Sequence, residues 1–204
     1  NSLVFSIRSS NVRFENLWIE QKATADESAT PHRHAVEIRG RSGGSNVVNI
    51  DAPDTESALS TTNILLKDCV LRSEAASGLF IHGQDANATV TGGSIQDCKL
   101  MGVAAVNYAD LTLDGVVVDN NGQHGIALFK ATLHLRNSII KNSKRAGIRL
   151  GPVGQATIES TEFFGNTESN LFISGETTPV SSDPKYVKAT VRLTNCTLRG
   201  NCRT

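Results

Sequence analysis

The sequence predicts an all-β parallel solenoid, in which a unit of three short extended segments is repeated along the chain. The repeat is clearest where LTL at 111–113 is followed fourteen positions later by GIAL at 125–128. LHL at 133–135 is followed at the same distance by GIRL at 147–150. Segments this short, with alternating apolar residues, are typical of strands rather than helices. A period of about 23 residues built from such segments is typical of a stacked solenoid.

The unit begins seven times along the chain. Its starts are Val12, Ile64, Ala88, Leu111, Leu133, Ala156 and Val191. The steps from Ile64 onward are 24, 23, 22, 23 and 35 residues, so the regular period is 22–24 residues. We therefore expect a single domain over residues 1–204 with about seven coils, which is long enough to bury a core.

One column of residues supports this alignment on physical grounds. The residues four positions after each start are Asn16, Asp68, Gly92, Gly115, Asn137, Ser160 and Asn195. Apart from Ser160, these residues tolerate the left-handed backbone conformation that a sharp turn between strands needs. Asn and Asp side chains in stacked coils can also hydrogen-bond to neighbouring coils. We interpret the column as a structural turn.

Two segments carry a family resemblance. LHLRN at 133–137 and NNGQHGIAL at 120–128 follow the pattern apolar-x-apolar-x-Asn, then Asn-x-x-x-Gly-apolar-x-apolar. In these repeats the chain resembles the right-handed parallel β-helix family, the pectate-lyase-like fold, over nearly its whole length. The resemblance implies the fold but not one function, because that family includes polysaccharide lyases, hydrolases and epimerases, viral tail proteins and non-catalytic repeat modules.

Composition narrows the classes of partner. The chain has 20 basic and 20 acidic residues, and its one basic cluster is KNSKR at 141–145, so nucleic acid is not expected as a partner. No apolar run approaches the roughly 20 residues of a membrane span. The spacing of Cys and His predicts neither a metal site nor a cofactor. Oligomer formation is left open.

The cysteines and the ends of the chain allow two further expectations. Cys69 and Cys196 occupy one column but lie in the second and seventh coils, too far apart for a disulfide, so we expect reduced thiols here and at Cys98 and Cys202. The sequence opens in a strand-like pattern, and its last unit stops before the glycine-led strand. This is consistent with a fragment of a longer solenoid.

Three connections are longer than the regular turns, at residues 22–34, 40–62 and 175–189. All three border the strand that follows the repeat glycine. Long connections within a compact repeat are often functional. We expect them to wall a trough about five coils long on that side of the solenoid.

The resemblance implies that a ligand would bind on this glycine-led strand, and alternation of side chains predicts which residues face outward there. Lyases and polygalacturonases of the β-helix family need several clustered carboxylates on this face, whereas Glu37 is the one acid in the predicted rows. Apolar residues such as Phe80 and Phe129 stand there instead, and an exposed apolar row typically marks a covered or binding surface. The predicted outward residues are Glu37 and Arg39, Phe80 and His82, Ala104 and Val106, Ala127 and Phe129, Arg149 and Gly151, and Phe172 and Ser174.

Two functions are compatible with these residues. The first is a non-catalytic binding or scaffold module that recognises a protein or a glycan. Its candidate binding residues are Glu37, Phe80, Asp85, Val106, Asp110, Phe129, Arg149 and Phe172. The alternative is a polysaccharide-active enzyme of the uronate lyase or epimerase type, in which Arg39 holds an anionic sugar while His82 and Tyr108 exchange protons with it. His32 and His34 would lie within reach of this cluster, whereas we interpret His124 as a structural residue in a turn. A third hypothesis is that the chain is part of a viral or cell-surface fibre.

Overall fold

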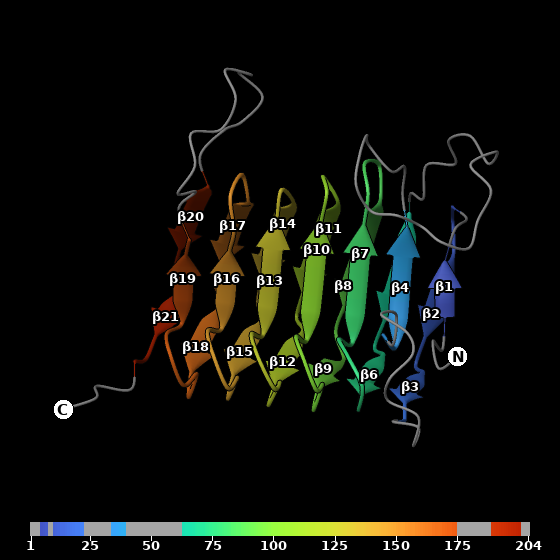
Figure 1. Cartoon of the computed structure of the whole chain (residues 1–204), viewed down its shortest axis with the longest axis horizontal. Coiled ribbons are helices and arrows are strands. Elements are labelled where there is room, and N and C mark those ends of the chain that lie inside the picture. Colours follow the sequence, from blue (N-terminus) through green and yellow to red (C-terminus); the bar gives the residue numbers. More distant parts are fainter. Residues whose placement is uncertain (1–4, 8–9, 23–33, 40–62, 175–188, 201–204) are drawn as a thin grey trace.

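A computed structural model describes residues 5–7, 10–22, 34–39, 63–174 and 189–200. These residues form three parallel sheets, stacked along one long axis (Figure 1). Sheet A contains β1 (Phe5–Ile7), β4 (Val36–Arg39), β7 (Leu79–His82), β10 (Val103–Val106), β13 (Ile126–Phe129), β16 (Ile148–Leu150) and β19 (Leu171–Ile173). Sheet B contains β2 (Arg13–Glu15), β5 (Ile64–Lys67), β8 (Asn87–Thr91), β11 (Asp110–Asp114), β14 (Thr132–Arg136), β17 (Gln155–Glu159) and β20 (Thr190–Thr194). Sheet C contains β3 (Trp18–Gln21), β6 (Val70–Ser73), β9 (Ser94–Gln96), β12 (Val117–Asp119), β15 (Ile139–Lys141), β18 (Glu162–Phe164) and β21 (Thr197–Leu198).

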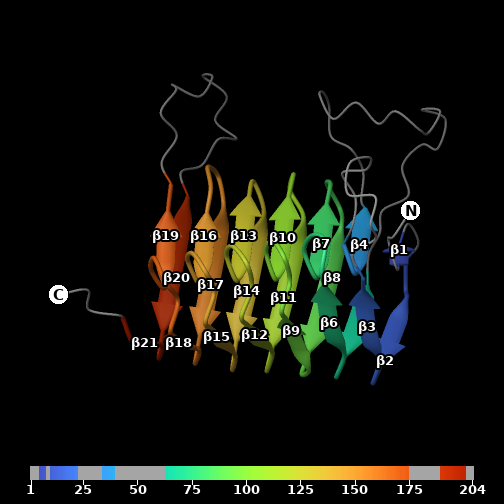
Figure 2. The ribbon, with the colours of Figure 1, turned by 60° about the horizontal axis from the view of Figure 1, so that its bottom comes forward.

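The all-β parallel solenoid predicted from the repeat is confirmed, but the number of coils is smaller than predicted. Between residues 63 and 174 the chain passes through sheets B, C and A in turn five times without a break. These are about five complete coils rather than seven. The described segments before residue 63 and after residue 174 add two more strands to each sheet. Each sheet therefore has seven strands, although the continuous run has about five coils (Figure 2).

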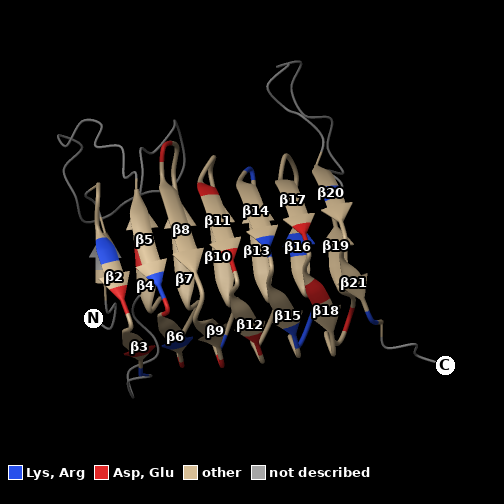
Figure 3. Cartoon of the chain, turned by 180° about the vertical axis from the view of Figure 1, so that it is seen from behind, with Lys and Arg blue, Asp and Glu red and all other residues tan. Residues whose placement is uncertain are grey.

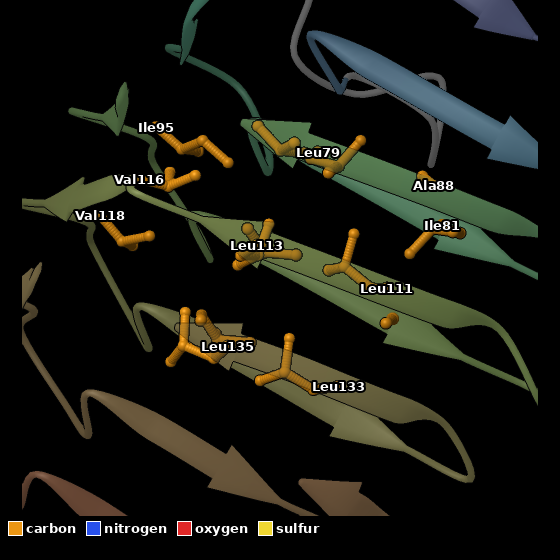
Figure 4. Close-up of a cluster of buried hydrophobic side chains, with 14 of the residues drawn as sticks. Leu79, Ile81, Ala88, Ile95, Leu111, Leu113, Val116, Val118, Leu133 and Leu135 are labelled. Carbon is orange, nitrogen blue, oxygen red and sulfur yellow. The ribbon is translucent and has the colours of Figure 1, made fainter. Parts of the chain in front are cut away.

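The register of the strands follows the repeat. Leu111 pairs with Ala88 on one side and with Leu133 on the other, so the first residue of each unit lies beside the first residue of the next. Alternate side chains point into the solenoid, and Leu111, Leu113, Leu133 and their neighbours fill its interior (Figure 4). These three side chains are fully buried. Each coil contributes aliphatic side chains at equivalent positions, and these stack on one another to form a continuous core.

The predicted turn column is confirmed. Its seven members all have positive φ, between 47° at Ser160 and 67° at Gly115. Ser160 therefore adopts the left-handed conformation without the glycine or amide side chain that favours it. Asn137 also bonds to the preceding coil. Its Nδ2 donates to Oδ1 of Asp114, the residue just before the column member Gly115 (2.9 Å).

Similar bonds and ion pairs tie other turns and outer faces together. Asn120 donates to Asp97 (2.7 Å), and Asn142 donates to Asp119 (2.9 Å), in each case from one coil to the preceding one. Ion pairs also join adjacent coils, such as Lys141 with Asp119 (3.3 Å). Figure 3 shows basic and acidic positions interspersed over the side that it presents, which agrees with the absence of a basic patch in the sequence.

Buried polar side chains at one corner are satisfied within the fold. The Oδ1 atoms of Asn121 and Asn166 accept hydrogen bonds from the backbone N–H groups of Cys98 and Ser143, each at 3.1 Å. Their Nδ2 atoms donate to backbone carbonyls of the preceding coils. Both asparagines are at most 4% exposed, so these bonds offset the cost of burying an amide.

The expected reduced cysteines are confirmed for the three that are described. Cys69, Cys98 and Cys196 form no disulfide, and Cys202 lies outside the described residues. Among the described residues no helix is both long and apolar enough to cross a membrane. The expanded connections at 22–34, 40–62 and 175–189 lie almost wholly outside the described residues, so the trough they were expected to wall stays a prediction.

The turn column predicts the effect of one substitution. Asn137→Ala should lower the free energy of unfolding by about 2 kcal/mol, because alanine pays ~1–2 kcal/mol in the left-handed region and the bond to Asp114 contributes roughly 0.5–1.5 kcal/mol. Urea denaturation measures the change. Asn137→Gly is the matched control, since glycine keeps the backbone conformation and loses only the bond. Equal losses for the two variants would contradict the account.

The thiol of Cys98 should be unreactive in the folded protein. Burial raises the pKa of this thiol to about 12, so the nucleophilic thiolate is scarce at pH 8. We expect iodoacetamide to modify Cys98 only as fast as the protein unfolds, while the partly exposed Cys196 reacts from the native state. Peptide mass spectrometry of timed samples separates the two sites. Native-state labelling of Cys98 at the rate of Cys196 would refute the prediction.

Candidate functional site

The outward face of sheet A carries two rows of side chains that run along the solenoid axis. The strand pairing places the predicted outward residues directly beside one another, coil by coil. The first row is Glu37, Phe80, Ala104, Ala127, Arg149 and Phe172, and the second contains Arg39, His82, Val106 and Phe129. We call these two rows the A face.

Burial confirms the predicted orientation for most of the A face. Leu79 and Ile81 are fully buried, whereas Phe80 and His82 between and after them are partly exposed. Phe129, on β13 with a strand on each side, is likewise partly exposed. The alternation of the repeat therefore predicted correctly which aromatic residues point outward.

Three members of the first row are not exposed as predicted. Ala104 and Ala127 are 3% and 2% exposed: they are adjacent in the row, and the pair of small side chains lies between Phe80 on one side and Arg149 on the other. Glu37, expected to face solvent, is only 1% exposed. Its strand neighbour is Phe80, whose ring is itself packed against another ring, so this end of the A face is crowded.

Phe80 is the middle of a stack of three rings. The His34 ring lies parallel to it, with centroids 4.4 Å apart and an interplanar angle of 6°. The His82 ring is offset on Phe80, with centroids 6.1 Å apart at 17°. His34 is held in turn by its Nδ1, which accepts the Ser77 N–H at 3.3 Å. The stack is thus fixed to the backbone of the adjoining coil.

His82 is also held by a polar partner, Asn107, at the end of β10. Asn107 Nδ2 lies 2.9 Å from His82 Nε2, so with the amide as donor the imidazole accepts at Nε2 and carries its proton on Nδ1. Asn107 has a φ of 55° and the following Tyr108 one of 69°. Two consecutive left-handed residues turn the chain sharply here, and Asn tolerates that conformation well.

A second cluster lies toward the other end of the A face. The Arg149 guanidinium lies over the Phe129 ring, with Cζ 5.1 Å from the ring centroid, a cation–π contact. Gly151 leaves room for that ring, because a Cβ at this position would overlap Phe129 Cδ1. Phe129 therefore leans over the next coil and is covered on one side by Arg149.

His124 occupies the same position in its coil as His34, three residues before the first row. Its Nδ1 accepts the Ala146 N–H at 3.2 Å, as His34 accepts the Ser77 N–H. Burial, followed by the nearby positive charges of Arg149 and Arg145, lowers the pKa of His124 below its ordinary value. The interpretation of His124 as a structural residue agrees with this bond.

The other predicted site residues lie in or next to turns, or outside the described side chains. Tyr108 is 49% exposed and lines a hollow of about 240 Å³ with Lys130, Thr132 and Val153, to which His82 does not contribute among the described residues. Asp110 begins β11 in sheet B, and Asp85 is an exposed turn residue with a φ of 65°. Arg39 pairs with His82 through the backbone, but its side chain lies outside what the structure describes, as does His32.

Several residues of interest were not foreseen from the sequence. Asn107 as the partner of His82 is one, although an Asn at a turn is a recognisable signal. Val153 adopts a φ of 61°, which is unusual for a β-branched residue. A second hollow, of about 420 Å³, lies on sheet B and is lined by Asn11, Arg13, Asn63, Asn87 and Thr89, with apolar residues beneath. Among the described residues no group of three His, Cys, Asp or Glu side chains is arranged to hold a metal ion.

Comparison with known proteins identifies the family. A family model described as "right handed beta helix region" matches residues 9–184, most of the chain. The chain belongs to the right-handed β-helix family. The β-helix fold inferred from the repeats is thereby confirmed by an independent comparison.

Comparison of this β-helix with individual proteins gives a remote structural match. One solved structure that it resembles is the full-length tailspike protein 2 from Escherichia coli O157:H7 bacteriophage CAB120, with a TM-score of 0.46 and 12% identity. The match covers 81% of this chain and 27% of the tailspike chain. A search of curated proteins finds no match.

The packing of Phe129 on the A face predicts the effect of Gly151→Ala. The added methyl group should displace the ring and with it the Arg149 contact, while the unfolding free energy changes by no more than about 1 kcal/mol because the overlap is with a partly exposed side chain that can turn away. Aromatic proton chemical shifts of Phe129 in the variant report the displacement. A control is Gly154→Ala, where the new Cβ would contact Gly151 O and lies away from the ring. Unchanged Phe129 shifts in Gly151→Ala would contradict the predicted overlap.

Proposed function

We propose that this β-helix is a non-catalytic recognition module that binds an extended saccharide along the A face. The observation that carries the proposal is the spacing of its aromatic residues. Phe80, Phe129 and Phe172 lie on β7, β13 and β19, which are successive alternate strands of sheet A. At about 4.8 Å between neighbouring strands, the strands that carry them recur every ~10 Å along the axis, with Phe80 and Phe172 in the first row and Phe129 in the second.

This interval suits a polysaccharide. An interval of that size is comparable to the disaccharide repeat of an extended polysaccharide chain. The C–H groups on one face of a pyranose ring are apolar and pack on the electron-rich face of an aromatic ring. In the first row the small side chains of Ala104 and Ala127 lie between Phe80 and Arg149, so a ligand chain can pass over them closely.

Polar groups stand beside the rings, as ligand specificity requires. The imidazole of His82 and the amide of Asn107 adjoin the Phe80 stack, and the guanidinium of Arg149 adjoins Phe129. Saccharide sites combine apolar stacking surfaces with a few oriented hydrogen-bonding groups. A protein partner would use the same face, and it becomes the stronger proposal if no saccharide binds.

The catalytic alternative, with Arg39, His82 and Tyr108 as in a uronate lyase or epimerase, has less support. His82 Nε2 is engaged by Asn107, Tyr108 lines a separate hollow, and Glu37 is buried. A general base must reach the proton that it abstracts, either directly or through one water molecule. The described residues of the A face also lack the carboxylate pair that hydrolysis of a glycosidic bond normally uses.

Recognition by stacking predicts the effect of removing one ring. Phe129→Ala should weaken binding of a matching polysaccharide about tenfold or more, since a well-packed aromatic contact contributes roughly 1–3 kcal/mol. Glycan-array screening identifies a ligand, and isothermal titration calorimetry then measures the change. Phe164→Ala is the matched control, because Phe164 faces outward from sheet C beside Lys141, much as Phe129 faces outward beside Arg149. Equal losses in both variants would count against the A face.

Substitution of His82 distinguishes binding from catalysis. We expect His82→Ala to alter affinity modestly. Neither the wild type nor the variant should release an unsaturated, shortened or epimerised sugar. Mass spectrometry of polysaccharide incubated with either protein detects such products. Turnover by the wild type that disappears in a folded His82→Ala variant would replace the binding proposal with the enzyme.

A further inference from the structure

Two buried N–H groups in adjacent coils lack acceptors among the described residues. His124 is 4% exposed, and because its Nδ1 accepts the Ala146 N–H, the proton of the neutral ring is on Nε2. That Nε2 is buried without a hydrogen-bond partner, as is Nε of Arg149. An unsatisfied buried donor costs about 1–3 kcal/mol, so such a pair calls for an explanation.

The repeat places these two donors together. His34 and His124 hold equivalent positions, and each accepts a backbone N–H of the next described coil at Nδ1. The His34 ring packs at 4.4 Å on Phe80 in that next coil. Arg149 occupies the position of Phe80 in the coil that follows His124, since both belong to the first row of the A face. The charge of Arg149 accordingly contributes to the lowered pKa of His124.

Neighbouring charges leave Arg149 available to an anion. Arg145, the other cation near His124, is paired with Glu168 at 3.2 Å. Within the described part of the chain Arg149 has no such carboxylate partner, and its guanidinium lies over the Phe129 ring. Its side chain is partly exposed, so a ligand can approach it from solvent, whereas the two unpaired nitrogens are buried and are reached only if side chains at this site move.

We propose that His124 and Arg149 form a subsite for the carboxylate of an acidic saccharide, an inference that rests on the saccharide-binding function proposed above. A carboxylate is planar and acceptor-only, and its two oxygens can take both N–H groups at once. Arg149 stands in the first row beside Phe172 and over Phe129. A sugar ring stacked on either phenylalanine would therefore bring its acid group to this pair of donors.

The test compares short oligogalacturonides with the same oligomers in which the carboxyl groups are methyl-esterified. We expect the acidic form to bind wild-type protein at least about tenfold more tightly, since hydrogen bonds to a charged group are the stronger kind. Arg149→Met keeps the aliphatic stem, removes the donors and should abolish this preference. Arg145→Met makes the same change of charge and should retain it. Circular dichroism confirms that both variants are folded.

A side-chain nitrogen spectrum supplies a second readout. The ¹⁵Nε2–H resonance of His124 should shift when the acidic oligomer binds and should not shift with the ester. Equal affinity for acid and ester overturns the carboxylate subsite while the saccharide-binding function stands. Loss of the preference in Arg145→Met as well as Arg149→Met also overturns it, since the effect is then one of net charge. Failure of both oligomers to bind overturns the subsite together with saccharide binding of this class.

Discussion

The structure depends on one constraint, that every coil must have nearly the same path so that parallel strands stay in register. Left-handed residues at the turns enforce this path, and one of them stands after the sheet B strand in every coil, as at Asn137 with a φ of 52°. Once the path is constant, a residue lies directly over its counterpart in the next coil. Aliphatic side chains then form core columns, and outward side chains form rows, without further specification.

Stacking also decides what kind of site the molecule can build. A residue's nearest neighbours on a face come from the coils before and after it, so contacts repeat with small variations. Arg149 over Phe129 on sheet A has a counterpart on sheet C, where Lys141 lies 6.0 Å from the Phe164 ring. His34 and His124 likewise make the same backbone contact in two different coils. Such a surface favours extended, repetitive ligands over compact ones.

The sequence predicted the parts of this structure that follow from period and alternation. The column of left-handed turn residues, the register and the outward direction of Phe80, Phe129 and Phe172 all follow from the repeat. A residue's position within its repeat unit determines its column, and alternation along the strand determines whether its side chain faces inward or outward. Contacts that depend on side-chain conformation were not predictable in this way. The bond from Asn107 to His82, the burial of Glu37 and the separate hollow at Tyr108 depend on turn geometry and on which way a long side chain leans.

Position along the solenoid decides which aromatic residue gives the clearest test of the A face as a ligand surface. Phe172 is 47% exposed, but Ile173, which occupies a core column of the last described sheet A strand, is 49% exposed. Its counterpart Leu150 one coil earlier is fully buried. Exposure at β19 thus reflects the lack of a described coil beyond it and is weak support for a ligand surface. Phe129 lies on β13, has strands on both sides and is still partly exposed, so a loss of binding there would speak for the A face itself.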